Sequence, residues 1–140
     1  MIVLDTNVLS ELMRERSDAG VVLWLKRWPP AALFTTSISH AEIMFGIRCL
    51  PAGQRRDVLD ATARHILDVV FSGRVLNFDR DAADCYAALA AARRAKGQSL
   101  AMADAMIAGI ARSRGARIAT RNVRDFSDTG VEVLDPWQTH

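Results

Sequence analysis

Short apolar runs alternate with longer helical segments along this sequence, and this alternation most restricts the possible fold. The first run, Ile2-Val3-Leu4, ends at Asp5, and comparable runs occupy residues 33–36, 75–78, 117–120 and 131–134. Helical spacing and capping residues predict helices over residues 8–14, 18–27, 39–50, 54–71, 79–96 and 102–114. Strands that alternate with helices favour a parallel sheet. We therefore predict an α/β fold with a central, mainly parallel sheet of four to five strands flanked by helices.

The length and composition are those of one globular domain, which we expect to span residues 1–140. Half of the residues are apolar and 24% are charged, so disorder and coiled coil are poor descriptions. No stretch reaches the roughly 18 uncharged apolar residues of a membrane span. The first residues lack the basic segment of a signal peptide, and the two cysteines form no CxxC motif. We expect a cytoplasmic protein with no membrane association.

The net charge of +2 does not by itself indicate a nucleic-acid-binding protein. Basic residues nevertheless gather in the second half of the chain: Arg93, Arg94, Lys96, Arg112, Arg114, Arg117, Arg121 and Arg124. Such a set forms either a phosphate-facing patch or ordinary solvated helix faces. The sequence leaves both interpretations open.

Asp5 and Glu42 each have a structural and a chemical interpretation. Asp5 directly follows the first predicted strand, at the edge where parallel sheets bind ligands, but aspartate is also a favoured helix cap. Glu42 lies three residues after Ser39, which is the spacing of a capping box. The neighbours that share its face of the predicted helix are apolar: Phe45, Gly46 and Cys49. We therefore expect this face to point inward, where a carboxylate is unfavourable unless it has a specific role.

Asp104 is the most informative acidic residue in the sequence. Its neighbours at helical spacing are all apolar: Leu100, Ala101, Ile107, Ala108 and Ala111. This spacing places the carboxylate within a buried stripe, where aspartate is rare unless it is paired or bound to a metal. The structural alternative is an aspartate in the first turn of a helix, where the helix dipole favours negative charge.

A polar segment, residues 120–126, follows the fourth predicted strand and offers an amide and a carboxylate, Asn122 and Asp125. By itself it is typical of a turn. Together with the three earlier acids it would form a cluster at one edge of the sheet, whose members repel one another unless a divalent cation lies among them. Hard oxygen ligands suit Mg²⁺ or Mn²⁺, and such ions serve phosphodiester hydrolysis. The residues therefore predict a metal-dependent phosphodiesterase.

Four segments, in this order, resemble the motifs of the PIN-domain family. They are IVLDTN at 2–7, SISHAE at 37–42, ADAMIA at 103–108 and TRNVRDF at 120–126. A Pro-Trp pair at 136–137 is typical of the VapC-type toxins of this family. The resemblance covers essentially the whole chain, and it implies a PIN-like domain with Mg²⁺ or Mn²⁺ held by Asp5, Glu42 and Asp104, with Thr6 assisting.

The resemblance also implies that Asn122 joins these acids as a catalytic residue. Many members of the family have an aspartate at its position, so either Asn122 or Asp125 completes the metal site. Arg121 and Arg124 in the same segment are candidates for RNA contact.

The activity that the resemblance implies is endonucleolytic cleavage of RNA. The chain would be a homodimer and the toxin of a type II, VapBC-like toxin–antitoxin pair, neutralised by a small antitoxin encoded beside it. The alternative is a catalytically inactive module of the same fold that binds RNA or a protein partner.

Overall fold

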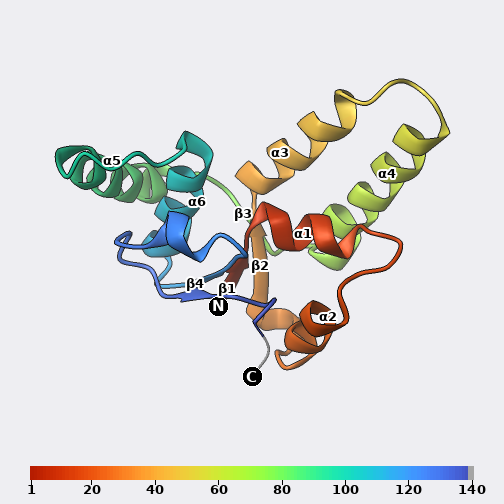
Figure 1. Ribbon diagram of the computed structural model, residues 1–140, viewed down its shortest axis with the longest axis horizontal. Coiled ribbons are helices and arrows are strands. Elements are labelled where there is room, and N and C mark those ends of the chain that lie inside the picture. Colours follow the sequence, from red (N-terminus) through yellow and green to blue (C-terminus); the bar gives the residue numbers. More distant parts are fainter. Residues whose placement is uncertain (139–140) are drawn as a thin grey trace.

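The computed structural model describes residues 1–138 and contains the predicted alternation of strands and helices (Figure 1). The strands are β1 (Ile2–Leu4), β2 (Leu33–Thr36), β3 (Val75–Leu76), β4 (Arg117–Ala119) and β5 (Val133–Leu134). The α-helices are α1 (Thr6–Leu12), α2 (Ala19–Lys26), α3 (Ser37–Arg48), α4 (Gln54–Arg64), α5 (Arg80–Ala95) and α6 (Met102–Ser113). Shorter turns are η1 (Pro30–Ala32), η3 (Val123–Phe126) and a π-helical turn, η2 (His65–Val70).

All five strands are parallel and lie in the order β3-β2-β1-β4-β5. Val3 lies beside Phe34 of β2 on one side and beside Ile118 of β4 on the other. The chain therefore leaves β1 in one direction across the sheet and later returns to its other side. Ligands of open parallel sheets bind beyond the carboxyl ends of the strands at such a reversal, which here is the gap between β1 and β4.

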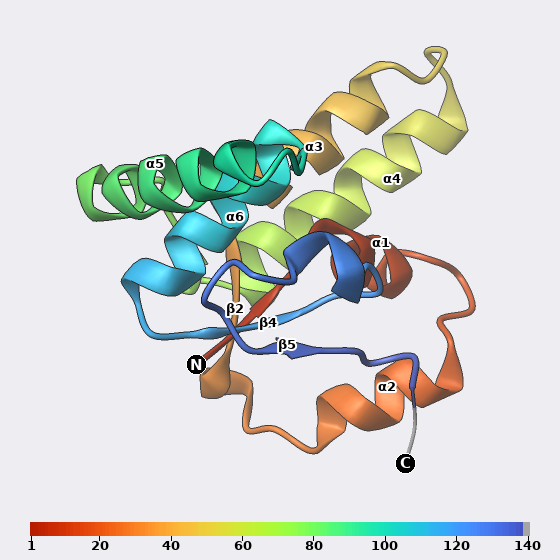
Figure 2. The same cartoon turned by 60° about the vertical axis from the view of Figure 1, so that its left-hand side comes forward.

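Helices cover both faces of the sheet, and the side chains of β1 alternate between two cores (Figure 2). Val3 packs in the core that contains α5 and α6, whereas Ile2 and Leu4 pack in the core that contains α1, α2 and α4. All three are fully buried, as expected for a parallel strand covered on both faces. Asp5 follows this rigid strand, so its position is fixed by packing on both sides.

The α3–α4 hairpin projects from the sheet, whereas α6 packs against β4 and carries α5 on its outer side (Figure 1). The α5–α6 contact is close because residue 109 of α6 is glycine: a Cβ there would lie 2.7 Å from the Ala82 carbonyl oxygen. Within residues 1–138, none of the helices combines the length and the apolar character that crossing a membrane requires.

The predicted α/β fold with a parallel sheet is confirmed, and three local predictions need correction. Helix α3 is capped by Thr36, whose hydroxyl accepts from the Ser39 N–H, so Ser39 is not the cap. The predicted helix over 54–71 continues past Arg64 as a π-helical turn. The third and fifth strands are shorter than their apolar runs, with two residues each in the ladder.

Candidate functional site

Asp5 is held in one orientation at the carboxyl end of β1. Its side chain is 4% exposed and also caps α1, since Oδ1 accepts from the Thr6 N–H at 2.8 Å. Oδ2 accepts from the Thr120 hydroxyl at 2.8 Å and from the Asn7 amide at 3.3 Å. The capping and chemical interpretations of Asp5 are therefore compatible, because the cap uses one lone pair of Oδ1 and leaves the other available.

Asn7 and Thr120 are two site residues that the sequence analysis did not identify. The Asn7 amide also donates to the Thr120 hydroxyl at 3.2 Å, and Asn7 Oδ1 accepts from the Arg121 N–H at 3.3 Å. The Asn122 N–H in turn donates to the Thr120 hydroxyl at 3.0 Å. These contacts join the ends of β1 and β4 across the reversal in the sheet. Both residues lie within the motif segments 2–7 and 120–126, but nothing in those segments assigned either of them a role.

Glu42 lies on α3 and contacts the site through Thr6. The Thr6 hydroxyl donates to Glu42 Oε1 at 2.6 Å and lies 2.9 Å from the buried Ser39 hydroxyl. The prediction that this face of the helix points inward is wrong: Glu42 is exposed and Phe45 is 72% exposed. Helix α3 instead buries Ile43 and Ile47. Glu42 is thus an accessible carboxylate fixed by one hydrogen bond.

Asp104 lies in the first turn of α6 and is half-buried. The predicted apolar stripe is present on its carboxyl side, where Ile107, Ala108 and Ala111 are fully buried. Ala101, on its amino side, is exposed, so the carboxylate lies at the open end of the stripe. This location combines both interpretations of the sequence: the helix dipole favours the negative charge, and the carboxylate still faces an accessible pocket.

The pKa values of Asp5 and Asp104 are both raised. Burial first, and then the charges of Asp5, Glu42 and Asp125, together raise the pKa of Asp104 to about 6. Burial also raises the pKa of Asp5, as do the charges of Glu42 and Asp125, while the hydrogen bonds from Thr120 and Thr6 act in the opposite direction. Carboxylates that share a partly desolvated site have this property, and so do many catalytic sites.

One pocket of about 520 Å³ brings most of the predicted site residues together. Its lining includes the predicted residues Asp5, Thr6, Glu42, Asp104, Arg121 and Asn122. Asp125 and Arg124 line an adjoining pocket that shares Arg121 and Asn122 with the first. By position, Asn122 is therefore better placed than Asp125 to act together with the three acids.

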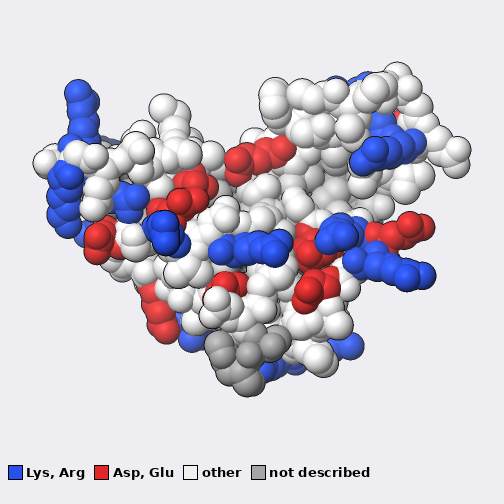
Figure 3. Space-filling model, viewed as in Figure 1, with Lys and Arg blue, Asp and Glu red and all other residues white. Residues whose placement is uncertain are grey.

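Charged side chains are concentrated around this region (Figure 3). Acidic side chains lie on both sides of the hollow between the α3–α4 hairpin and the α5–α6 pair, and basic side chains lie beside it. One of the basic residues at the pocket, Arg121, lies over the indole of Trp137, with its guanidinium carbon 5.1 Å from the ring centroid. The pocket therefore has an acidic interior and basic residues at its mouth.

The donor set has the chemistry of a site for a hard divalent cation. Asp5 and Asp104 offer carboxylate oxygens, whereas the pocket contains no histidine or cysteine. In residues 1–138, no three His, Cys, Asp or Glu side chains already lie close enough together to enclose a metal ion. Carboxylate oxygens are ligands that Mg²⁺ accepts, commonly one or two of them, while it keeps several of its waters.

Comparisons with known proteins agree with this architecture. The family model of the PIN domain matches residues 2–132. The chain is 37% identical over 138 residues to VapC ribonuclease Y4jK of Sinorhizobium fredii, with 99% of both chains covered. It is 34% identical to toxin FitB of Neisseria gonorrhoeae, with 98% of this chain and 99% of FitB covered.

A solved structure of FitAB bound to an IR36 DNA fragment contains a chain of the same fold. It superimposes with a TM-score of 0.91 at 33% sequence identity, covering 100% of this chain and 98% of the other. The match is to the full length in both directions, as it is for the two relatives. The family model, the relatives and the fold agree, and this chain belongs to the PIN-domain family.

Proposed function

We propose that this chain is a metal-dependent endoribonuclease that acts as the toxin of a type II toxin–antitoxin pair. The observation that carries the proposal is the one pocket that Asp5, Glu42 and Asp104 line from three distant parts of the chain, with raised pKa values for the two aspartates. Acids brought together at this energetic cost are explained by a cation that they bind. The similarity to a VapC ribonuclease and to toxin FitB supports RNA as the substrate and toxicity as the outcome.

Asp5 and Asp104 are the residues that would hold Mg²⁺ or Mn²⁺, with Glu42 completing the acidic set. The bound ion would polarise a phosphodiester and lower the pKa of a water molecule. Thr6 occupies only Oε1 of Glu42, which leaves Oε2 free to accept a proton from an attacking water. Asn122 lines the same pocket, and its side-chain amide would donate to a phosphate oxygen.

The hydrogen bonds around Asp5 prepare the site before substrate binds. Thr6, Asn7 and Thr120 fix both oxygens of Asp5, so little reorganisation is needed when the pocket fills. Partners of this kind orient metal ligands and commonly matter ten- to a hundredfold for activity or affinity, to order of magnitude. The role of Asn7 and Thr120 in this proposal is therefore positioning.

The test is brief expression of the protein in a bacterium, followed by sequencing of RNA 5′ ends. The parent should arrest growth and create new ends at discrete sites, and Asp104→Asn, at equal abundance, should do neither. Growth arrest without new RNA ends would favour the alternative, a catalytically inactive module that sequesters RNA or a partner. Normal growth with abundant folded parent protein would contradict the toxin assignment.

The partners in this proposal are a small antitoxin and a second copy of the chain. Co-expression of the adjacent small open reading frame should restore growth and leave a stable complex that copurifies with the protein. Sedimentation of the purified chain at micromolar concentration should give the mass of a homodimer. A chain that stays monomeric at all concentrations would contradict the homodimer without affecting the antitoxin partnership.

A further inference from the structure

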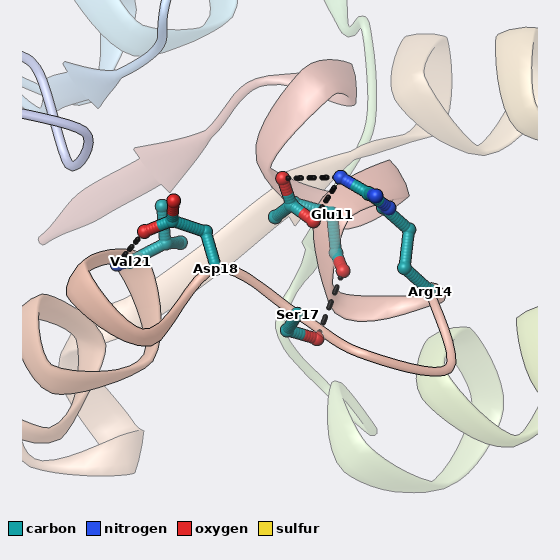
Figure 4. Close-up of polar contacts among 5 residues, drawn as sticks. All are labelled: Glu11, Arg14, Ser17, Asp18 and Val21. Carbon is teal, nitrogen blue, oxygen red and sulfur yellow. Dashed lines mark hydrogen bonds and ion pairs between the residues drawn. The ribbon is translucent and has the colours of Figure 1, made fainter.

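The carboxylate of Glu11, near the end of α1, is buried beside the acidic pocket. Glu11 is 5% exposed and belongs to the residues that line the pocket. A buried carboxylate needs a partner, because leaving one unpaired is costly. Its partner is Arg14, one turn later: Nη1 lies 3.3 Å from Oε1 and 3.2 Å from Oε2 (Figure 4).

Arg14 is the exposed member of this pair. Its side chain is 67% exposed, and a single nitrogen, Nη1, contacts both oxygens of Glu11. No other hydrogen bond of the Arg14 side chain is found within residues 1–138, so Nη2 and Nε remain available. A guanidinium offers its nitrogens as a planar fork that matches a phosphate. The buried carboxylate thus orients a guanidinium whose other edge faces solvent.

The segment after α1 keeps this arrangement in place. The Ser17 hydroxyl donates to the Glu11 carbonyl oxygen at 3.0 Å, and the Asp18 carboxylate caps α2 by accepting from the Val21 N–H at 3.0 Å (Figure 4). These contacts tie the loop from α1 to α2 to the end of α1. Arg14 satisfies the buried Glu11 carboxylate through Nη1 alone, so this structural role does not use the rest of the guanidinium.

Arg14 and Arg121 both line the acidic pocket, on two different segments of the chain. Asp5, Glu42 and Asp104 would repel the phosphates of an RNA strand on either side of the bond that is cut. Basic side chains at the mouth of the pocket offset this repulsion and fix the path of the strand. Arg121 has an aromatic partner, Trp137, whereas Arg14 has a buried anionic one.

We propose that Arg14 binds a backbone phosphate of the RNA strand in the acidic pocket, and that Glu11 positions the Arg14 guanidinium for this contact. The proposal rests on the function proposed above, since it takes RNA as the ligand. Its distinctive consequence concerns charge. If Glu11 were only another anion near RNA, neutralising it would strengthen RNA binding; as a positioning residue, its loss weakens binding.

The experiment measures binding of a fluorescently labelled, random-sequence single-stranded RNA 12-mer in EDTA at several salt concentrations. The variants are Arg14→Ala, Arg14→Lys, Glu11→Gln and the double variant, with Arg16→Ala as the matched control. Arg16 is an exposed arginine two residues away that does not line the pocket. Thermal midpoints of all variants show that each is folded.

Arg14→Ala should weaken binding about tenfold, the scale of one charge-assisted hydrogen bond, and should reduce the salt slope by about 0.7, one single-strand phosphate contact. Arg14→Lys should keep the salt slope and lose part of the affinity, because it retains the charge without the fork. Glu11→Gln should weaken binding about threefold, roughly half the logarithmic loss of Arg14→Ala. In the double variant, Glu11→Gln should weaken RNA binding no further than Arg14→Ala does alone.

Equal binding by Arg14→Ala and Arg16→Ala would overturn the proposal, and so would tighter binding by Glu11→Gln. Loss of antitoxin binding by Arg14→Ala, with RNA binding unchanged, would assign the residue to the protein partner instead and also overturn it. A parent protein that binds no RNA would contradict the proposal directly. A parent that binds RNA with the expected Arg14 dependence but never cleaves it with Mn²⁺ would contradict only the proposed nuclease function.

Discussion

The Thr120 hydroxyl donates a 2.8 Å hydrogen bond to Oδ2 of Asp5, a residue 115 positions earlier in the chain. The contact exists because β1 and β4 are neighbours in the sheet, with Leu4 beside Ala119. Both residues are buried, and the hydrogen bond lowers the pKa of Asp5 against the effect of its burial. The pairing of β1 with β4 thus affects the pKa of a carboxylate in the site.

Replacing Thr120 with valine should therefore affect activity more than stability. The variant keeps the volume but removes a donor to a buried carboxylate and the acceptor of the Asn7 amide and the Asn122 N–H, which should cost about 1–3 kcal/mol of unfolding free energy. The pKa of Asp5 should rise further, and RNA cleavage should fall about ten- to a hundredfold, as for partners of metal ligands. Urea unfolding and cleavage rates measure the two effects. Unchanged cleavage in a folded Thr120→Val protein would contradict the positioning role.

Asp104→Asn should stabilise the metal-free protein or leave its stability unchanged, by 0 to ~2 kcal/mol at neutral pH. The substitution removes a partly buried charge that Asp5 and Glu42 repel. It also removes an anionic ligand, so the rise in thermal midpoint caused by Mn²⁺ should be mostly lost. Thermal melts with Mn²⁺ and with EDTA test both points. A strongly destabilised variant with an intact Mn²⁺ response would show that Asp104 is a structural hydrogen-bonding group.

The raised pKa of Asp104 also predicts how this difference depends on pH. The folded protein retains the Asp104 proton up to a pKa of about 6, whereas the unfolded chain releases it near the ordinary value of 3.8. Stability contributed by the protonated acid is therefore complete below about pH 4 and is lost as pH rises through about 6. The advantage of Asp104→Asn over the parent should grow across this range in EDTA. Urea unfolding at several pH values would contradict the account if the advantage shrank with rising pH.

Asn122 and Asp125 should differ in their effect on cleavage. Asn122 lines the pocket of the three acids, whereas Asp125 lines the adjoining pocket and acts on Asp5 and Asp104 through its charge. Asn122→Ala should lower the cleavage rate about a hundredfold, the scale of losing one donor to a developing charge. Asp125→Ala should remain within about threefold of the parent, as expected of a charge near the surface. A larger loss of cleavage for Asp125→Ala than for Asn122→Ala would mean that Asp125 completes the metal site.

The overall fold and the locations of Asp5 and Asp104 could be predicted because each depends on local patterns. Apolar runs bounded by turn residues correspond to the five strands, and the residues that follow β1 and β4 reach the same edge. The fully buried residues after Asp104 follow its predicted stripe. Patterns of this kind require only nearest neighbours along one helix or strand.

Features that depend on tertiary arrangement could not be predicted in this way. Asn7 and Thr120 are residues typical of turns, and they contact each other only because β1 and β4 lie side by side. Their neighbours in the sequence do not indicate that these two strands pair. The face of α3 that carries Phe45 is apolar but exposed, because α3 projects with α4 as a hairpin and buries its opposite side. Helix spacing shows which residues share a face, and packing decides which face is covered.

Cleavage of single-stranded RNA by the purified protein tests whether this acidic pocket acts with a bound divalent ion. The parent should cut the RNA with Mg²⁺ or Mn²⁺, EDTA should abolish cleavage, and restored Mn²⁺ should recover it. Asp104→Asn should remain folded and lower the rate at least about a hundredfold. Cleavage that persists in excess chelator, or that Asp104→Asn retains in full, would contradict the account.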